Sequence, residues 1–577
     1  MSHRGQPYRP DTLNNKKQCR RYNLGLCTLS QGKGINMRKD IERIIKEDKY
    51  LTGRRGNWDS YRQDVCNFCL PRKAWINTIK VTGARLQDDF LYDSRAILAL
   101  KESACGFHSK LTNPATRWFE SRTLSDRFMQ SGAVQKYFKE VDDTQFDIMN
   151  NTNWDEAMLE FYMDDLSVGI ANILTEEDPK KHVRYSAVPV QQYNVQRDDT
   201  GEVCKVYRSF KWTAYKCQDR WGKGITAEMK KAIEDDKGFT EFDILHYVGK
   251  RYVRDVSKKD NYNMEFESIW IAKKEAIQLE ESGFVELPYS IARFWIDATD
   301  DDGGFSPAMD VLASIKLVNA QKRTIIRKAQ KDADPATMSP AKFWIAPLNL
   351  NPTAMNYYDA TKFKPEQFAP IQTGGNLPQA VEIMAIEQEL IDRGFFIPLF
   401  RALSDVTKQM TVPEVQQRIA EGLSLISPVV GRMMNTIKGT LLRTYGVLDR
   451  RLMFPEPPKE IQGQEMNINF LSPLAKAQRQ SEIAGLMAWV EFVKGLSDPN
   501  FMPSAKDNLN IDSIVNRSRD LFGVDPNNVN EQKIVQQIRM RQAQAMAEQS
   551  KLQTAETGAK AGRDAAEAHQ RLKEAEK

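Results

Sequence analysis

Cysteine and histidine are the residue types in this sequence that could bind a metal or act as nucleophile and base. Cys66 and Cys69 form a CxxC pair, a spacing at which thiolates hold zinc, and Cys19 with Cys27 could complete a four-thiolate site. The interval between the two pairs is irregular and no histidine lies near them, so reduced thiols are the better interpretation. The five histidines include no HExxH pair. We therefore expect no metal and no cofactor.

Phosphate-binding and calcium-binding motifs are also absent from the sequence. The glycine-rich segments around Lys33 and Lys223 lack the upstream glycine and the hydroxyl residue of a phosphate-binding loop, which argues against an ATPase. The acidic run that begins at Asp297 has Asp302 where a calcium loop needs glycine and Ala308 where it needs glutamate. The sequence thus predicts no catalytic residue, and we expect a structural protein and not an enzyme.

Basic side chains recur at helical spacing in residues 306–334, and they are the candidate binding residues of this sequence. A basic face on a helix can attract phosphates independently of base sequence. Alternatively, this stripe forms ion pairs with an acidic helix at 379–393 of the same or a neighbouring subunit. We expect such ion pairs to neutralise much of the stripe. The basic residues are Lys316, Arg323, Arg327 and Lys331, and the acidic ones are Glu382, Glu387, Glu389 and Asp392.

The basic and acidic stretches lie on two predicted helices that a proline-rich segment separates. Ser306 suits the N-cap, Pro307 suits the first helical position, and Pro335 ends the first helix. That helix would be about 43 Å long at 1.5 Å per residue. Seven prolines from 335 to 378 exclude a long helix in that segment, and the second helix runs from about Gln379 to Arg393. This pattern predicts a stalk with a compact insert at its tip.

A β region follows the first helical stretch, so the predicted fold class is α+β, mainly α. Apolar residues recur at helical spacing in much of 37–180. Two β-rich runs at 183–195 and 202–215 then predict a hairpin across the turn composition at 198–201.

The C-terminal part of the chain is predicted to be helical. Thr411 and Glu414 form a capping box that begins a long helix, and Pro428 should kink that helix before it resumes toward Val447. The last hundred residues are again helical and end in a polar stretch, 553–577, which is either a solvated helix or disordered.

Charge is distributed unevenly along the 577 residues. The net charge is only +5, but residues 1–39 hold nine basic residues and one acidic residue, or +8, which leaves about −3 for the rest. We expect residues 1–36 to be a basic arm, either a disordered leader or a segment that touches nucleic acid, with Met37 as an alternative start. The sequence has no apolar run of 18 residues, so we expect no membrane span and no signal peptide. Synthesis in a cytoplasm is the corresponding expectation.

Several short segments occur in a fixed order over residues 37–545. They contain Trp58, Tyr61, Arg62, Phe68, Pro71, Asp93 to Ala96, Leu111 to Pro114, Trp118, Phe119, Leu287, Pro288, Arg293 to Trp295, Gly304, Pro307 to Met309, Ile315, Lys316, Asn319, Met410, Thr411, Glu414, Arg418, Pro428, Gly431, Arg432 and Pro455 to Pro458. In their order and spacing, these segments resemble the portal proteins that connect head and tail in short-tailed bacteriophages. Gly303, Phe305 and Ser306 depart from the family's pattern at the junction that precedes the first long helix.

The resemblance implies a portal fold assembled as a ring of twelve subunits around a central channel. After the arm at 1–36, it assigns a wing to 37–305 and to the kinked helix and return at 412–475. It assigns a stem to 306–334 with 379–395, a clip to 335–378, a tunnel loop to 396–411 and a helical crown to 476–577. The ring would sit at one capsid vertex of the virion, after assembly in the host cytoplasm.

The same resemblance implies roles for residues and partners. Phe343 and Trp344 would seal neighbouring subunits at the clip, where the terminase large subunit and later the tail adaptor would dock. Arg401 and Lys408 would contact double-stranded DNA through its phosphates, without sequence preference. Scaffold and major capsid protein are the other expected partners, and no membrane is involved.

Two other functions remain alternatives at this point. A terminase-like nuclease or ATPase would need the phosphate loop that the sequence lacks. A basic-armed adaptor that works as a monomer would depend on residues 1–36, whereas ring formation should survive their loss.

Overall fold

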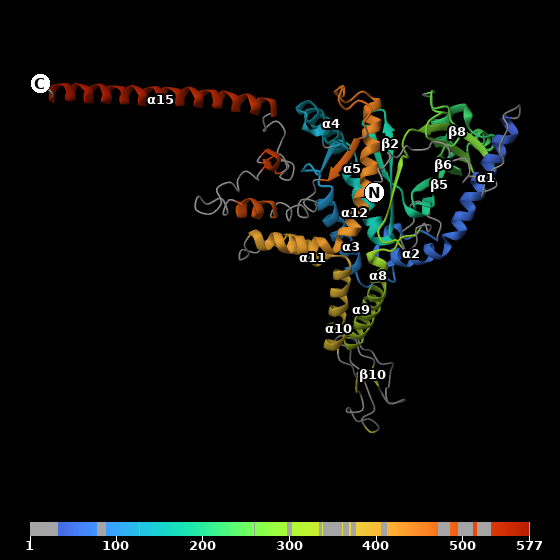
Figure 1. Cartoon of the computed structure of the whole chain (residues 1–577). Helices are drawn as coiled ribbons and strands as arrows, with labels where there is room; N and C mark the ends of the chain where they lie inside the picture. Colours follow the sequence, from blue (N-terminus) through green and yellow to red (C-terminus); the bar gives the residue numbers. More distant parts are fainter. Residues whose placement is uncertain are drawn as a thin grey trace, which may run out of the picture. The chain divides into compact units, whose positions relative to one another are not determined.

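The computed structural model combines helices with small β-sheets, which confirms the predicted α+β class (Figure 1). It describes residues 33–77, 88–125, 127–258, 260–296, 303–333, 337–338, 361, 369–370, 377–404, 412–464, 466–470, 485–493, 510, 512–515, 518 and 532–575. The chain divides into two compact units. One comprises Met1–Tyr50, Phe210–His246 and Ile269–Glu281, and the other comprises Leu51–Ser209, Tyr247–Ser268 and Ser282–Lys577.

The helices follow the chain from one end of the described part to the other. They are α1 Lys33–Arg54, α2 Gly56–Cys69, α3 Arg95–Leu111, α4 Gly132–Asn150, α5 Trp154–Val168, α6 Ala214–Trp221, α7 Ala227–Glu234, α8 Pro307–Asp310, α9 Leu312–Ala333, α10 Leu377–Gly394, α11 Ile397–Ser404, α12 Val412–Arg450 and α15 Gln532–Ala575.

The strands form four sheets within the described residues, in the orders β3-β2-β9, β4-β5-β6-β7-β8, β1-β12 and β10-β11. Their bounds are β1 Phe119–Thr123, β2 Ile170–Asp178, β3 His182–Ala187, β4 Tyr193–Arg197, β5 Val203–Thr213, β6 Glu241–Lys250, β7 Phe266–Ala272, β8 Ile277–Phe284, β9 Tyr289–Arg293, β10 Thr337–Met338, β11 Ala369–Pro370 and β12 Met466–Phe470.

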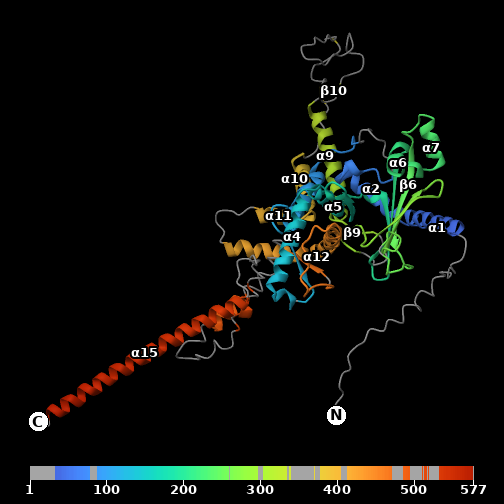
Figure 2. The same ribbon diagram turned by 90° about the horizontal axis from the view of Figure 1, so that it is seen from above.

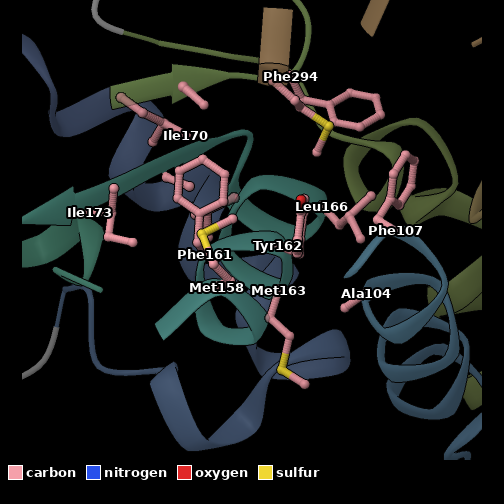
Figure 3. Close-up of a cluster of buried hydrophobic side chains, with 14 of the residues drawn as sticks. Ala104, Phe107, Met158, Phe161, Tyr162, Met163, Leu166, Ile170, Ile173 and Phe294 are labelled. Carbon is pink, nitrogen blue, oxygen red and sulfur yellow. The ribbon is translucent and has the colours of Figure 1, made fainter. Parts of the chain in front are cut away.

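Helix α5 is the centre of the larger unit. Most of its residues are buried, Asp164 and Asp165 among them. Figure 3 shows Phe161, Tyr162 and Leu166 of α5 among side chains from α3 and β2, including Phe107 and Ile170. The smaller unit has a separate core, made by Ala214, Cys217, Ile225, Met229, Ile244, Trp270 and Ala272.

A glycine contact joins the end of α5 to the segment before α8. Gly169 has φ +76°, and a Cβ at this position would lie 2.1 Å from the carbonyl oxygen of Gly304. Next to this contact, the Ser306 hydroxyl donates to Ser167 O (2.6 Å) and accepts from Met309 N (3.1 Å). The predicted cap at Ser306 is therefore confirmed, and it also ties the start of the long helix to the core.

The predicted helix at 306–334 is present as α8 and α9, with a non-helical residue at Val311 between them. The second predicted helix is present as α10 and begins two residues earlier than expected. The predicted long helix is α12, which contains Pro428 and ends at Arg450. Thr411 and the Glu414 side chain lie outside the described residues, so their capping box stays a prediction.

The predicted hairpin is confirmed only in its second half. β4 pairs with β5 across the 198–201 turn, where Gly201 has φ +85°. The first β-rich run is split, because a 3-10 turn at Val190–Gln192 follows Pro189, and β3 pairs with β2 instead. Periodicity marks a run as extended but does not identify its partner strand.

The cysteine pair at the end of α2 belongs to the core. Burial raises the pKa of the Cys66 thiol to about 12 and also raises the pKa of the Cys69 thiol. In the described part of the chain, no group of three or more metal-ligating side chains comes together. None of the helices described there has both the length and the apolar character of a membrane crossing.

Asp165 in the middle of α5 is a buried carboxyl group, and neither of its oxygens has a hydrogen-bond partner among the described residues. Burial raises its pKa from 3.8 to about 8, with Asp164 raising it further and Arg432 opposing the shift. Between these two pH values the folded chain holds a proton that the unfolded chain has released. The stability that this carboxyl group contributes is therefore fully present below pH 3.8, and it is lost as the pH rises toward 8.

We predict that Asp165→Asn flattens this pH dependence by up to about 1.4 kcal/mol per pH unit. The measurement is the free energy of unfolding in denaturant at several pH values between 5 and 8. Asp178→Asn is the matched control, because backbone N–H groups of Lys181 and Lys180 lower the pKa of the exposed Asp178, which does not titrate in this range. If the free energy of unfolding of Asp165→Asn depends on pH as steeply as that of wild type, Asp165 is not the group responsible.

Candidate assembly and channel surfaces

Helices α9 and α10 pack side by side as a helical hairpin (Figure 1, Figure 2). On α9, Leu312, Ile315 and Val318 are buried, and each is three residues from the next. A Cβ on Gly394, at the end of α10, would lie 2.3 Å from Val311 Cγ1. Any larger residue at 394 would force the Val311 side chain or its backbone to shift.

Asn319 of α9 binds the backbone of the segment before α3. Its Oδ1 accepts hydrogen bonds from Tyr92 N (2.7 Å) and Asp93 N (3.1 Å). Its Nδ2 donates to Phe90 O (2.9 Å). One amide side chain thus satisfies three backbone groups that form part of no helix or sheet, and it fixes the rotation of α9 against this segment.

Asp93 collects contacts from both helices of the hairpin. Its carboxylate accepts from Lys322 Nζ of α9 (3.3 Å) and from Gln388 Nε2 of α10 (3.4 Å). It also accepts from Arg95 N (3.2 Å), which belongs to the first turn of α3. We call the contacts of Asn319 and Asp93 with these partners the collar.

Two arginine–carboxylate pairs extend the collar to α11. Arg95 of α3 binds Asp392 of α10 through both its Nε and an Nη group. Arg401 of α11 binds Glu102 of α3 through Nε (2.8 Å) and Nη2 (2.9 Å). The hydrogen bonds from Arg401 lower the pKa of Glu102. Bidentate pairs of this kind fix orientation as well as distance.

The basic stripe of α9 has two parts with different surroundings. At the base of the hairpin, Lys316 binds Asp64 of α2 (2.8 Å) and the Arg323 guanidinium lies 5.5 Å from the centre of the Tyr92 ring. Arg327 and Lys331, farther along α9, are exposed. Within the described residues, neither of them has an ion pair.

The acidic residues of α10 also differ from one another. Asp392 is buried and pairs with Arg95, and Glu389 pairs with Arg393 of its own helix (2.6 Å). Glu382 and Glu387 have no ion pair in the described part of the chain. The expected pairing between the basic stripe and these acids is thus not made inside one chain. Pairing with a neighbouring subunit stays a prediction.

Both helices of the hairpin also expose large apolar side chains. The exposed fractions range from 37% to 56%, although burial of such side chains is the rule in stable helical pairs. On α9 they are Leu317 and Ile326, and on α10 they are Val381, Ile383, Ile386 and Leu390.

A family model described as "Bacteriophage head to tail connecting protein" matches residues 42–529. The chain belongs to this family. The portal protein of Salmonella phage epsilon15 is 25% identical over 531 residues, covering 90% of this chain and 94% of that relative. The probable portal protein of Bordetella phage BPP-1 is 25% identical over 524 residues, covering 89% and 93%. The sequence-based resemblance to this family is therefore confirmed.

Two solved structures of gene transfer agent particles are also similar, but more distantly. The neck of an empty particle has a TM-score of 0.32 at 12% identity, covering 71% of this chain and 91% of that chain. The native virion has a TM-score of 0.30 at 11% identity, covering 68% and 94%. At these TM-scores we draw no conclusion from the likeness.

For this head to tail connecting protein, the structure brings only some of the predicted site residues together. Arg401, Asp392, Lys316 and Arg323 lie around the collar, although their direct partners were not predicted. Pro428 is inside α12. Phe343, Trp344, Lys408 and Thr411 lie outside the described residues.

Sequence reasoning missed the collar itself. Asn319 and Asp93 were singled out only as positions of family resemblance, and Glu102 was not singled out at all. An asparagine in mid-helix and an aspartate before a helix are weak signals, because such residues are commonly solvated or cap their own helix. Asn319 and Asp93 could have been identified from the sequence because both occur in segments that match the connecting protein family.

We predict that Asn319→Ala loosens residues 90–93 of this connecting protein without unfolding it. Losing the acceptor for two backbone amides costs about 1–3 kcal/mol locally, so hydrogen exchange at the Tyr92 and Asp93 amides should accelerate roughly tenfold or more. Asn319→Asp is a comparison variant, since it keeps the acceptor for the two amides but replaces the donor to Phe90 O by a carboxylate oxygen and adds a negative charge near Asp93. Equal exchange rates in wild type and Asn319→Ala would show that Asn319 does not hold residues 90–93 in place.

Proposed function

We propose that this protein forms a dodecameric portal ring at one vertex of a phage capsid. The ring would be the channel for packaging and ejecting double-stranded DNA. It would bind the terminase large subunit during packaging and the tail adaptor afterwards. The observation that carries this proposal is the family match over residues 42–529, together with portal relatives that are matched over almost their whole length.

The exposed apolar side chains of the hairpin support self-association. An apolar face on two helices at once is costly in water and is typical of a surface that another protein covers. In a ring, each hairpin would lie between two others, so both of its sides could be buried by neighbours. A single chain has no means of covering these faces with the residues described.

The charges of the hairpin support one particular arrangement in the ring. Residues 312–333 hold six basic residues and one acidic residue, or +5, and residues 377–394 hold four acidic residues and one basic residue, or −3. Different faces that attract each other create a head-to-tail contact, which closes into a ring when the rotation allows it. We therefore propose that α9 of one subunit meets α10 of the next.

The division into parts follows the sequence-based assignment and is likewise a proposal. The wing would comprise 37–305 and 412–475, the stem 306–334 with 379–395, and the clip 335–378. The clip would hold Phe343 and Trp344 and would receive terminase and then the adaptor. The crown would comprise 476–577, and scaffold and major capsid protein would contact the outside of the ring.

The tunnel region at 396–411 is the proposed place of DNA contact. Arg401 is already held by Glu102, so its charge is partly balanced, and a phosphate would have to compete with a bidentate carboxylate. Lys408 is therefore the better candidate for a DNA contact. A weak, sequence-independent contact suits a channel in which DNA slides.

We predict that the purified chain forms rings with a central hole in negative-stain electron microscopy. Arg327→Glu with Lys331→Glu should reduce ring yield, because it places like charges against Glu382 and Glu387 of the neighbour. Adding Glu382→Lys with Glu387→Lys should restore the yield by reversing both sides. If only compact monomers are seen at all salt and protein concentrations, the proposed ring assembly is wrong.

The same variants separate the two roles considered for the stripe. If Arg327 and Lys331 face the channel, the double charge reversal should leave ring yield unchanged and alter DNA retention in assembled particles. If they pair with the neighbouring α10, ring yield should change first and the compensating reversal should rescue it.

We predict that Lys408→Glu lowers DNA retention in packaged particles while rings still assemble. The readout is the amount of DNA protected from nuclease per particle. Arg401→Glu with Glu102→Arg keeps the ion pair in swapped form and serves as the control for disturbing α11. Charge reversal at both Arg401 and Lys408 should also reduce retention, but it breaks the pair between Arg401 and Glu102. Normal retention in Lys408→Glu would contradict the DNA contact.

A further inference from the structure

A cavity of about 260 Å³ lies in the smaller unit of the chain. All the residues that line it fall within Phe210–His246 and Ile269–Glu281, which belong to this unit. Its apolar lining comprises Met229 of α7, Phe242 of β6 and Ala272 of β7. The other lining residues are Glu228, Thr240, Glu241, Asp243, Lys274 and Glu275. The cavity thus combines apolar side chains with an excess of carboxylates.

Basic side chains balance the carboxylates of the cavity only in part. Four acidic lining residues stand against one basic residue, or −3. Lys274 pairs with Glu228 (3.0 Å). Glu241 and Asp243 are exposed, and neither has an ion pair among the residues that the structure describes. A ligand that carries both apolar and basic side chains would therefore complement this cavity.

Helix α1 belongs, up to Tyr50, to the same compact unit as the cavity. Asp48 of α1 is buried, and its carboxylate accepts a hydrogen bond from Lys273 Nζ (2.6 Å). The two chain neighbours of Lys273, Ala272 and Lys274, both line the cavity. Residue 48 of α1 is therefore fixed close to the cavity.

Residues 1–32 precede α1 and lie outside the described residues. They hold six basic residues and one acidic residue, or +5. Four of the six basic residues occur in residues 16–22, which we call the basic segment. It consists of Lys16, Lys17, Gln18, Cys19, Arg20, Arg21 and Tyr22. The basic segment thus combines positive charge with one large aromatic side chain.

The basic segment is close enough to α1 in the chain to reach the cavity. From Lys33 to Asp48, α1 rises by about 22 Å at 1.5 Å per residue. The chain from Tyr22 to Lys33 spans up to about 36 Å when fully extended. Because this tether is longer than that stretch of helix, the basic segment can return along α1. A tethered segment also needs only weak affinity, since its effective concentration near the site is roughly millimolar.

We propose that the basic segment of the N-terminal arm docks in the cavity of its own chain. Tyr22 would pack on Met229 and Phe242. The lysines and arginines would lie beside Glu241 and Asp243, which attract them. The contact is made within one chain and does not depend on ring formation. It would also occupy basic side chains that could otherwise bind DNA phosphates without sequence preference.

Disulfide trapping through the native Cys19 tests the contact in the full-length chain. Cys27, Cys105 and Cys204 are replaced by serine in every variant, which leaves Cys19 and three buried native cysteines. Thr240→Cys then adds a thiol to the cavity without changing its charge. After gentle oxidation, mass spectrometry of non-reduced peptides reports the bond between residues 19 and 240. A non-reducing gel shows whether that bond lies within one chain or joins two.

Gln218→Cys is the matched control for random collisions of the tethered arm. Gln218 is an exposed, uncharged residue of α6 in the same unit, and it does not line the cavity. We expect the bond within one chain to form several-fold faster with Thr240→Cys than with Gln218→Cys. Equal rates at the two positions overturn the proposed contact. A bond that joins two chains also overturns it, because the arm of a second copy would then be the occupant.

Charge reversal tests whether the carboxylates of the cavity hold the basic segment. Glu241→Lys with Asp243→Lys should slow formation of the bond between residues 19 and 240 several-fold. Glu234→Lys with Asp235→Lys changes the charge of the unit equally at exposed positions outside the cavity lining, so it should leave the rate unchanged. If the first pair has no effect, or both pairs slow the bond equally, the carboxylates of the cavity do not recognise the basic segment.

Discussion

The hydrogen bonds of Asn319 to residues 90–93 are the constraint on which the presentation of the α9/α10 hairpin depends. Apolar packing holds the base of α9 through Leu312, Ile315 and Val318, but apolar contacts are not directional. The collar adds direction, because each of its bonds requires a particular rotation of α9 or α10. The faces that remain exposed farther along the hairpin are therefore set by contacts at its base.

The collar also explains how charge is shared between the chain and its surroundings. Lys316, Lys322, Asp392 and Arg401 find partners at the base, where they hold elements of the same chain together. Arg327 and Glu382, farther along the hairpin, are exposed and have no ion pair in the described part of the chain. The hairpin, with one basic and one acidic helix, is thus fixed at its base and exposes charged side chains farther along its length.

The core beneath the hairpin combines close packing with buried polar groups. Gly169 and Gly304 allow two backbone segments to approach closely next to α5, and Ser306 links that junction to the first turn of α8. Asp165 lies in the same helix without a hydrogen-bond partner among the described residues. Burial of an unpaired carboxyl group costs free energy, so this centre makes the fold sensitive to pH in a way that surface charges do not.

The sequence by itself determined the family, the α+β class, the two hairpin helices and the Ser306 cap, because prolines, capping residues and apolar spacing act over a few residues. Only the tertiary structure decided the partners of the charged side chains. Arg95 binds Asp392 and Arg401 binds Glu102 across 297 and 299 residues of sequence, and no local pattern encodes such a distance. The same holds for the pairing of β3 with β2, since an extended run carries no mark of its neighbour. Local free energies select helices and turns, whereas pairing follows from which surfaces the folded chain brings within reach.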